Sequence, residues 1–233
     1  YKRQIVTSMA GPAIGKTLCD DDRIRKMTFT GSTEVGRILM RQSAGTLKKI
    51  SLELGGNAPL IVFDDADIDT AIAGTIASKY RNAGQTCVCA NRIFVQDGIY
   101  DEFAHRLTEA TAAMKVGNGM EDGVEQGPII DGQGLDKIER HVTDARAKGA
   151  EVLTGGGRHA LGGTYFEPTV LTGMTPEMEM FREETFGPVA GLFRFSTDDE
   201  AVAMANDTEF GLAAYIFTNN TSRLFRVSEA LEY

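Results

Sequence analysis

A cysteine near the middle of the chain has the surroundings best suited to covalent chemistry. Cys87 lies in the segment Asn82-Ala83-Gly84-Gln85-Thr86-Cys87-Val88-Cys89, which directly follows a predicted helix, where a side chain can project into a cleft. A thiolate attacks a carbonyl carbon well and forms an intermediate that is later oxidised or hydrolysed. Buried structural cysteines are the commoner case, so this segment alone leaves both interpretations open.

Two charged residues have positions compatible with a reaction at a carbonyl group. Glu53 stands at the end of an otherwise apolar strand, just before a glycine pair. A carboxylate there is costly to bury unless it is paired or kept for proton transfer. Arg81 lies upstream of Cys87, and its guanidinium could bind an anionic substrate group as a fork. The alternatives are a surface carboxylate for Glu53 and a cation at a helix C-terminus for Arg81.

Two further segments could hold a nucleotide. In Phe29-Thr30-Gly31-Ser32-Thr33-Glu34-Val35-Gly36 a strand ends, Gly31 permits close backbone approach, and Ser32 begins a helix whose free N–H groups suit a pyrophosphate. In Glu183-Glu184-Thr185-Phe186-Gly187-Pro188 a carboxylate and an aromatic ring two residues apart could hold a ribose diol and a ring face. A simple N-cap and an ordinary acidic loop are the alternatives.

Composition excludes several classes of protein. The chain has 233 residues, 42% of them hydrophobic, enough for one large or two small domains. A formal charge of -9 and a pI near 4.9 argue against non-specific nucleic-acid binding. The apolar stretch 58–63 is too short to cross a bilayer. Three cysteines make no disulfide framework, which favours a reducing, cytoplasmic compartment. No metal site is predicted, because Cys19 and three scattered histidines do not supply zinc ligands at suitable spacing.

Strand and helix patterns alternate along the whole chain, which predicts an α/β fold with a substantially parallel sheet. The expected strands are residues 27–30, 50–54, 60–63, 92–96, 152–153, 193–195 and 213–217. The expected helices begin near Ser32, Asp67, Ile99, Leu135 and Thr197, the last with a capping-box pattern. The glycines at 155–157 and 162–163 indicate turns. Gly11 and Gly15 flank a possible strand-to-helix turn, and residues 231–233 are expected within a helix.

Four motifs, taken together and in this order, resemble the aldehyde dehydrogenase superfamily. They are residues 29–36, Glu53-Leu54-Gly55-Gly56-Asn57, Gly84-Gln85-Thr86-Cys87, and Glu184-Thr185-Phe186-Gly187-Pro188. The stretches 79–92 and 205–215 look most like succinate-semialdehyde dehydrogenases. The resemblance implies an aldehyde dehydrogenase-like fold, with residues 1–54 ending a Rossmann-like NAD(P)-binding domain and residues 55–233 forming most of an α/β catalytic domain. With Tyr1 in place of an initiator Met, the chain is expected to be a fragment.

The resemblance implies a role in the reaction for four of the candidate residues. Cys87 matches the nucleophile that forms a thiohemiacetal and then a thioester. Glu53 matches the general base that activates the deacylating water. Arg81 matches an arginine that binds the carboxylate of the substrate. Cys89 matches the second cysteine of a Cys-x-Cys pair, for which a redox disulfide with the nucleophile has been proposed.

The remaining candidates are implied to hold the cofactor, NAD or NADP. Gly31 and Ser32 match the pyrophosphate contact, and Glu184 and Phe186 match the groups around the nicotinamide ribose. The family's oxyanion asparagine, its adenosine-ribose contacts and its C-terminal segment have no counterpart in this sequence. The remaining residues suit NAD and NADP alike.

The implied activity is oxidation of succinate semialdehyde to succinate by a homo-oligomeric enzyme, with a small-molecule aldehyde as partner and a place in GABA degradation. A dehydrogenase for a neighbouring substrate such as glutarate semialdehyde is the first alternative. A non-catalytic module that kept the fold is the second. A hydrolase that pairs Cys87 with His105, His141 or His159 is the third, and no motif supports it.

Overall fold

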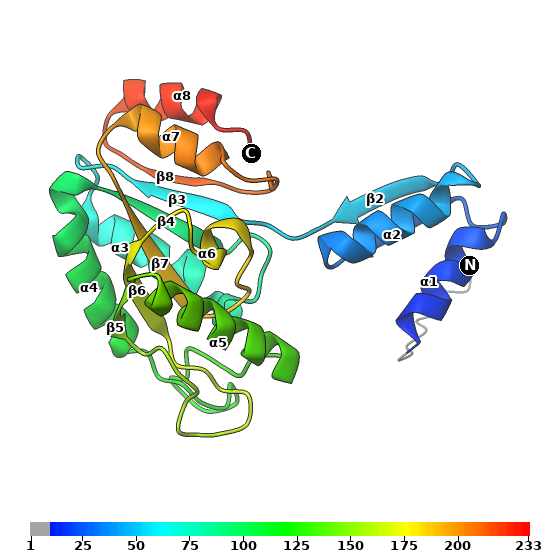
Figure 1. Cartoon of the computed structure of the whole chain (residues 1–233), viewed down its shortest axis with the longest axis horizontal. Coiled ribbons are helices and arrows are strands. Elements are labelled where there is room, and N and C mark those ends of the chain that lie inside the picture. The colour runs from blue at the N-terminus through cyan, green and yellow to red at the C-terminus, as the bar shows by residue number, and fades with distance from the viewer. Residues whose placement is uncertain (1–9) are drawn as a thin grey trace. The chain divides into compact units, whose positions relative to one another are not determined.

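The structure, a computed structural model, describes residues 10–233. The chain forms two compact units, Tyr1–Gly55 and Gly56–Tyr233, which we call the N-terminal and C-terminal units (Figure 1). Each unit is described by itself. Among the described residues, no helix combines the length and the apolar character that crossing a membrane requires.

The N-terminal unit is a small α/β layer. Its elements are α1 (Gly11–Asp20), β1 (Lys26–Thr30), α2 (Thr33–Ala44) and β2 (Lys49–Glu53). The two strands pair in parallel, with Thr30 opposite Glu53 at their carboxyl ends. Gly15 lies inside α1, so the turn predicted around it is wrong. Pro12 explains the helix, because its fixed φ suits the first helical turn.

The C-terminal unit is built on a six-stranded sheet with the order β5-β6-β7-β4-β3-β8. The strands are β3 (Ala58–Val62), β4 (Ala90–Gln96), β5 (Glu151–Thr154), β6 (Thr169–Met174), β7 (Val189–Phe195) and β8 (Tyr215–Phe217). Every neighbouring pair is parallel except β5 and β6. The predicted α/β class with a substantially parallel sheet is therefore confirmed.

Helices cover both faces of this sheet (Figure 1). They are α3 (Ile68–Lys79), η1 (Arg81–Gly84), η2 (Asp97–Ile99), α4 (Tyr100–Ala112), α5 (Gly132–Ala147), α6 (Glu179–Arg182), α7 (Asp198–Asn206) and α8 (Thr221–Ala230). Alternate residues of β3 point to opposite faces: Leu60 packs in the core beneath α3 and α4, and Ile61 packs in the core beneath α5 to α8. Burial on both faces explains the continuous apolar run of this strand.

Side-chain caps set the helix starts that the sequence predicts. Asp67 accepts a hydrogen bond from the Thr70 N–H at 2.8 Å, and Thr197 accepts one from the Glu200 N–H at 3.2 Å. The Glu200 carboxylate in turn accepts from the Ser196 N–H at 2.8 Å, which completes the capping box one residue earlier than the pattern indicates.

Two features near the end of the chain depart from expectation. Strand β6 and helix α6 carry no clear periodicity and were not predicted. The expected helix over residues 231–233 is wrong, since α8 ends at Ala230 and Leu231 is extended. The cause is a long-range cap: the Asn206 side chain donates to the Ala230 carbonyl at 2.9 Å and accepts from the Glu232 N–H at 3.1 Å.

Candidate active site

The segment before Cys87 is a left-handed turn. Asn82, Ala83 and Gly84 have φ values of 55°, 55° and 72°, a conformation that costs energy for residues with a Cβ. The side chain of Gln85 holds the turn in place. Its Nε2 donates to the Asn82 and Pro128 carbonyls at 3.1 and 3.2 Å, and its Oε1 accepts from the Ile130 N–H at 2.9 Å. Such a turn persists only where the surrounding structure stabilises it, so the backbone that leads to Cys87 is held in one conformation.

Three loops of the C-terminal unit meet backbone to backbone around this cysteine. A Cβ at Gly56 would overlap the carbonyl oxygen of Cys87, and a Cβ at Gly84 would overlap the carbonyl of Gly187. The Gly56 N–H also donates to Oε1 of Glu184 at 3.1 Å. The structure therefore brings together Cys87 and Glu184, two of the predicted site residues, from segments almost a hundred positions apart.

The two thiols of the Cys-x-Cys pair have different environments. Cys87 is half-buried, whereas Cys89 is buried and its Sγ lies 2.9 Å from Oγ1 of Thr86. The Cys89 N–H donates to the Thr86 carbonyl at 3.0 Å, closing a tight turn over the pair. Both are free thiols. The redox role of Cys89 stays a prediction, and its contacts also agree with simple packing.

Arg81 and Lys79 lie close together at the C-terminal end of α3, but they differ in their exposure to solvent. Arg81 is exposed at the first position of η1, and no carboxylate among the described residues forms an ion pair with it. Lys79 is 1% exposed, and its burial lowers its pKa to about 8, against the opposing influence of Cys89 and Glu184. Sequence reasoning missed Lys79. It shares the buried i, i+4 row of α3 with Ala71 and Thr75, and this row was a usable signal.

The loop that carries Glu184 and Phe186 is held by a buried pair of asparagines. The Thr185 N–H donates to Oδ1 of Asn91 at 3.0 Å, and Nδ2 of Asn91 donates to Oδ1 of Asn57 at 2.6 Å. Asn57 and Asn91 are each at most 2% exposed. Phe186 itself is left-handed, with φ 55°, and partly exposed. Sequence reasoning missed both asparagines, although a polar residue beside an apolar strand is a signal for such a bond.

The candidate residues of the C-terminal unit share one edge of its sheet. Cys87 precedes β4, Asn57 precedes β3 and Glu184 precedes β7, so all three lie at the amino ends of parallel strands. Tyr215, the first residue of β8, adds a further tie because its hydroxyl donates to the Val88 carbonyl at 2.7 Å. This edge is the candidate active site of the unit.

The candidate residues of the N-terminal unit lie at the opposite end of their strands. Ser32 caps α2 and accepts from the Val35 N–H at 3.4 Å, which leaves the other N–H groups of the first turn available to an anion. The Gly31 N–H donates to the Glu53 carbonyl at 3.0 Å, so Gly31 and Glu53 are neighbours where β1 and β2 end. All three candidate residues are exposed.

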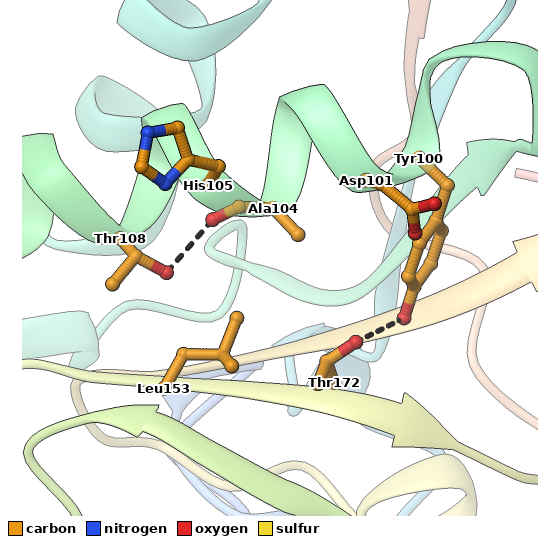
Figure 2. A pocket seen from close by; sticks show the side chains of 7 residues that line it. All are labelled: Tyr100, Asp101, Ala104, His105, Thr108, Leu153 and Thr172. Carbon is orange, nitrogen blue, oxygen red and sulfur yellow. Dashed lines mark hydrogen bonds between the residues drawn. The ribbon is translucent and has the colours of Figure 1, made fainter.

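The three histidines are engaged elsewhere. His105 lines a shallow cavity of about 320 Å³ between α4 and the strands β5 and β6, which Tyr100 and Thr172, joined by a hydrogen bond of 2.7 Å, also line (Figure 2). His159 accepts from the Leu161 N–H, and His141 contacts Glu183 and Thr185. Among the described residues, none of these rings is hydrogen-bonded to Cys87.

One cluster of potential metal ligands was not expected from the sequence. Ligand atoms of His141, Glu179 and Glu183 lie within 4.8 Å of one another. Arg140 forms ion pairs with both carboxylates, and its Nη2 lies 2.9 Å from Oε2 of Glu183. A guanidinium therefore already supplies the positive charge that these carboxylates attract.

The sequence as a whole matches the model of the aldehyde dehydrogenase family over residues 3–233. The chain belongs to this family. The resemblance inferred from the four motifs is thus confirmed, together with the fold that it implies.

The chain is similar to several aldehyde dehydrogenases. A 3-sulfolactaldehyde dehydrogenase from Pseudomonas putida is 58% identical, and an NADP(+) succinate-semialdehyde dehydrogenase from Escherichia coli K12 is 55% identical; each match covers 98% of this chain and 47% of the relative. The crystal structure of a succinate-semialdehyde dehydrogenase from Burkholderia pseudomallei superimposes with a TM-score of 0.96 at 57% identity, over 98% of this chain and 47% of that one. The chain thus spans about half the length of these relatives.

Proposed function

We propose that this chain carries the nucleophile and the cofactor-binding residues of an NAD(P)-dependent dehydrogenase that oxidises succinate semialdehyde to succinate. The observation that carries the proposal is the backbone packing of the Cys87 segment against Gly56 and the Glu184 loop. Residues 1–54 then belong to the cofactor domain and residues 55–233 to the catalytic domain. The membership of the chain in the aldehyde dehydrogenase family supports this assignment.

The residues available suit a dinucleotide. In the N-terminal unit, Gly31 and Ser32 present the free N–H groups of α2, which suit a pyrophosphate. In the C-terminal unit, the Glu184 carboxylate suits the hydroxyls of the nicotinamide ribose, with Phe186 beside it. When bound, the cofactor supplies a hydride acceptor. Of the two relatives compared, the one from E. coli carries NADP(+) in its name.

In the proposed reaction the Cys87 thiolate adds to the aldehyde carbon and forms a thiohemiacetal. Loss of hydride from that carbon leaves a thioester on Cys87. Glu53 then takes a proton from a water molecule as the water attacks the thioester carbon, and the carboxylic acid leaves with release of the thiolate. Each turnover consumes one aldehyde, one water and one oxidised cofactor, and it yields one carboxylic acid, one reduced cofactor and one proton.

Arg81 is proposed to select substrates with an anionic end. Its guanidinium is exposed and has no ion-pair partner among the described residues, and it lies on the same short connection as Cys87. The two relatives act, by their names, on a sulfonated aldehyde and on a carboxylated one. A guanidinium fork binds either anionic group, and it selects for the charge of the substrate more than for its chain length. Glutarate semialdehyde therefore remains the alternative substrate.

The remaining expectations belong to the whole protein. We propose that the whole protein is a homo-oligomer located in the cytoplasm. Three free cysteines support the location alone, since a reducing compartment keeps thiols reduced. A non-catalytic module is the alternative of a different class. It predicts that the protein binds no NAD(P)+, which a fluorescence titration with NADPH would reveal.

The nucleophile is tested by Cys87→Ala in the full-length protein that carries this sequence. We expect aldehyde-dependent formation of NAD(P)H to fall to background, because no other group forms the thioester. Cys89→Ala is the matched control, since it removes a buried thiol two residues away, and we expect it to keep most of the activity. Near wild-type turnover by Cys87→Ala would overturn the assignment, and loss of activity in Cys89→Ala alone would transfer it to Cys89.

The substrate class is tested by Arg81→Ala. We expect KM for succinate semialdehyde to rise by a factor that corresponds to roughly 2–4 kcal/mol if the bound carboxylate buries the charge pair with Arg81, while KM for an uncharged aldehyde of similar length stays nearly constant. Equal effects on both substrates would remove the carboxylate assignment. A comparison of succinate with glutarate semialdehyde in the wild type then settles the preferred chain length.

A further inference from the structure

The buried histidine of α5 lies directly behind the loop that carries Glu184. We infer that His141 is a positioning residue, whose imidazole fixes the backbone of residues 183–187 and thereby aims the Glu184 carboxylate. This inference rests on the proposed function only for the identity of the ligand that Glu184 holds. We call the contacts of His141 with this loop the brace; they are a property of the folded C-terminal unit.

Both ring nitrogens of His141 contact this loop. Nδ1 lies 3.2 Å from Oγ1 of Thr185, and Nε2 lies 3.3 Å from Oε2 of Glu183. The histidine is fully buried, and Thr185 is 1% exposed. The His141 side chain therefore contacts the residues immediately before and after Glu184. The other buried residues of α5 belong to the hydrophobic core.

The charges around the ring select one tautomer. Burial lowers the pKa of His141 to about 4, so the imidazole is neutral at physiological pH. The Arg140 guanidinium lowers the pKa of the Glu183 carboxyl, which is therefore ionised and can only accept hydrogen bonds. Nε2 lies 3.3 Å from Oε2 of Glu183 and 3.5 Å from Nη2 of Arg140, a longer contact. We therefore assign the proton to Nε2, which then donates to Glu183, while Nδ1 accepts from the Thr185 hydroxyl.

A second anchor holds the same loop from the sheet. Asn91 of β4 accepts from the Thr185 N–H at 3.0 Å and donates to the Glu183 carbonyl at 3.2 Å. The residues that flank Glu184 are thus fixed by α5 on one side and by β4 on the other. Both peptide groups around Glu184 are therefore restrained, and the Gly56 N–H, which donates to Oε1 of Glu184 at 3.1 Å, directs the partly exposed carboxylate.

His141→Leu, Thr185→Val and the double variant test the brace in the full-length protein. We expect His141→Leu to raise KM for NAD(P)+ about tenfold, the effect of one lost directional contact, with KM for the aldehyde nearly unchanged. Thr185→Val should do the same, and the double variant should be no worse than either single one. His141→Gln, whose amide can donate to Glu183 and accept from Thr185, should restore most of the loss.

Val142→Ala is the matched control, because it weakens the packing of α5 in the core and keeps both contacts of the His141 ring with the loop. Its thermal destabilisation should equal or exceed that of His141→Leu, while its cofactor KM stays at the wild-type value. If the two variants change cofactor KM alike, His141 only supports the core and the inference is overturned.

Hydrogen exchange of the cofactor-free protein separates this inference from the proposed function. We expect the amides of residues 183–187 to exchange at least tenfold faster in His141→Leu than in Val142→Ala, whatever ligand Glu184 binds. Faster exchange without any NAD(P)+ binding by the wild type would keep the brace and refute the proposed cofactor. Unchanged exchange in an active enzyme would refute the brace and keep the cofactor.

Discussion

In the N-terminal unit Gly31 and Glu53 lie where parallel strands end, whereas in the C-terminal unit Cys87 and Glu184 lie where parallel strands begin. The carboxyl end of a strand leads into the N-terminus of a helix, and the dipole and free N–H groups of that helix attract anions. The N-terminal unit therefore offers a preformed phosphate-binding site at the start of α2, which we call the phosphate seat. The amino ends in the C-terminal unit follow irregular connections, which can place a nucleophile on a strained turn.

The two units also differ in how tightly their candidate residues are held. In the C-terminal unit, Gly56 and Gly84 face backbone carbonyls that cannot move aside. In the N-terminal unit, a Cβ at Gly31 would meet the ring of Phe29, and one at Gly36 would meet the side chain of Leu54. Side chains can rotate away, so the nucleophile's surroundings are fixed more rigidly than the phosphate seat.

The largest expected effect tests the chemical role assigned to the N-terminal unit. Glu53→Gln removes the proposed base but leaves an isosteric side chain, so we expect steady-state turnover to drop on the order of a hundredfold or more. A rapid burst of about one NAD(P)H per active site should survive, because formation of the thioester does not need the base. Stopped-flow absorbance at 340 nm measures both phases. If the burst were lost together with steady-state turnover, Glu53 would act in the formation of the thioester and not only in its hydrolysis.

The next effect tests how strongly the C-terminal unit depends on its buried polar groups. Arg92 is fully buried and donates to the carbonyls of Asn57 at 3.2 Å, Met204 at 2.8 Å and Ala205 at 2.7 Å. Arg92→Met removes the donor of the Asn57 and Met204 carbonyls, while the Ala205 carbonyl keeps the Tyr233 hydroxyl at 2.7 Å. We expect the substitution to lower the free energy of unfolding by about 3–5 kcal/mol. Arg182→Met, which removes an exposed pair with Asp207, should cost less than about 1 kcal/mol. Urea denaturation followed by circular dichroism gives both values.

A third effect concerns pH and is confined to the C-terminal unit. His141 has a folded pKa of about 4, below the 6.5 of the unfolded chain, so the unfolded state binds a proton first as pH falls. The contribution to stability is zero above about pH 7 and reaches a loss of about 2 kcal/mol at pH 5.

His141→Gln should remove this part of the acid destabilisation, because the amide of glutamine does not titrate in this range. The groups that face His141 are Glu179, Glu183, Arg140 and Lys137. The pKa of Glu183 is lowered, so its stabilising contribution is lost only below about pH 4.5, in a separate window. Identical slopes for the wild type and His141→Gln between pH 7 and 5 would contradict the buried neutral state.

The sequence predicted local features well and long-range ones poorly. Asp67 and Thr197 cap their helices as expected, since a cap depends on residues within one turn. Asn206 ends α8 from a distant part of the chain, and Asn57, just before β3, accepts from Asn91 of β4, 34 positions away. No periodic pattern reveals such contacts. Cys87 and Glu184 were identified through motif order, because proximity between such distant segments leaves no trace in composition. His141 appeared only as a hydrolase candidate, and its contacts with Glu183 and Thr185 required the fold.

The smallest effect compares two helix caps, one in each unit. Ser32 caps α2 and Thr197 caps α7, so Ser32→Ala and Thr197→Ala should each lower the free energy of unfolding by about 1 kcal/mol. Only Ser32 lies at the proposed phosphate seat, and its loss also removes a hydroxyl that can donate to a pyrophosphate. We therefore expect Ser32→Ala to raise KM for NAD(P)+ severalfold and Thr197→Ala to leave it unchanged. If the two substitutions proved equivalent in KM as well as in stability, α2 would be an ordinary helix and the phosphate seat would have to lie elsewhere.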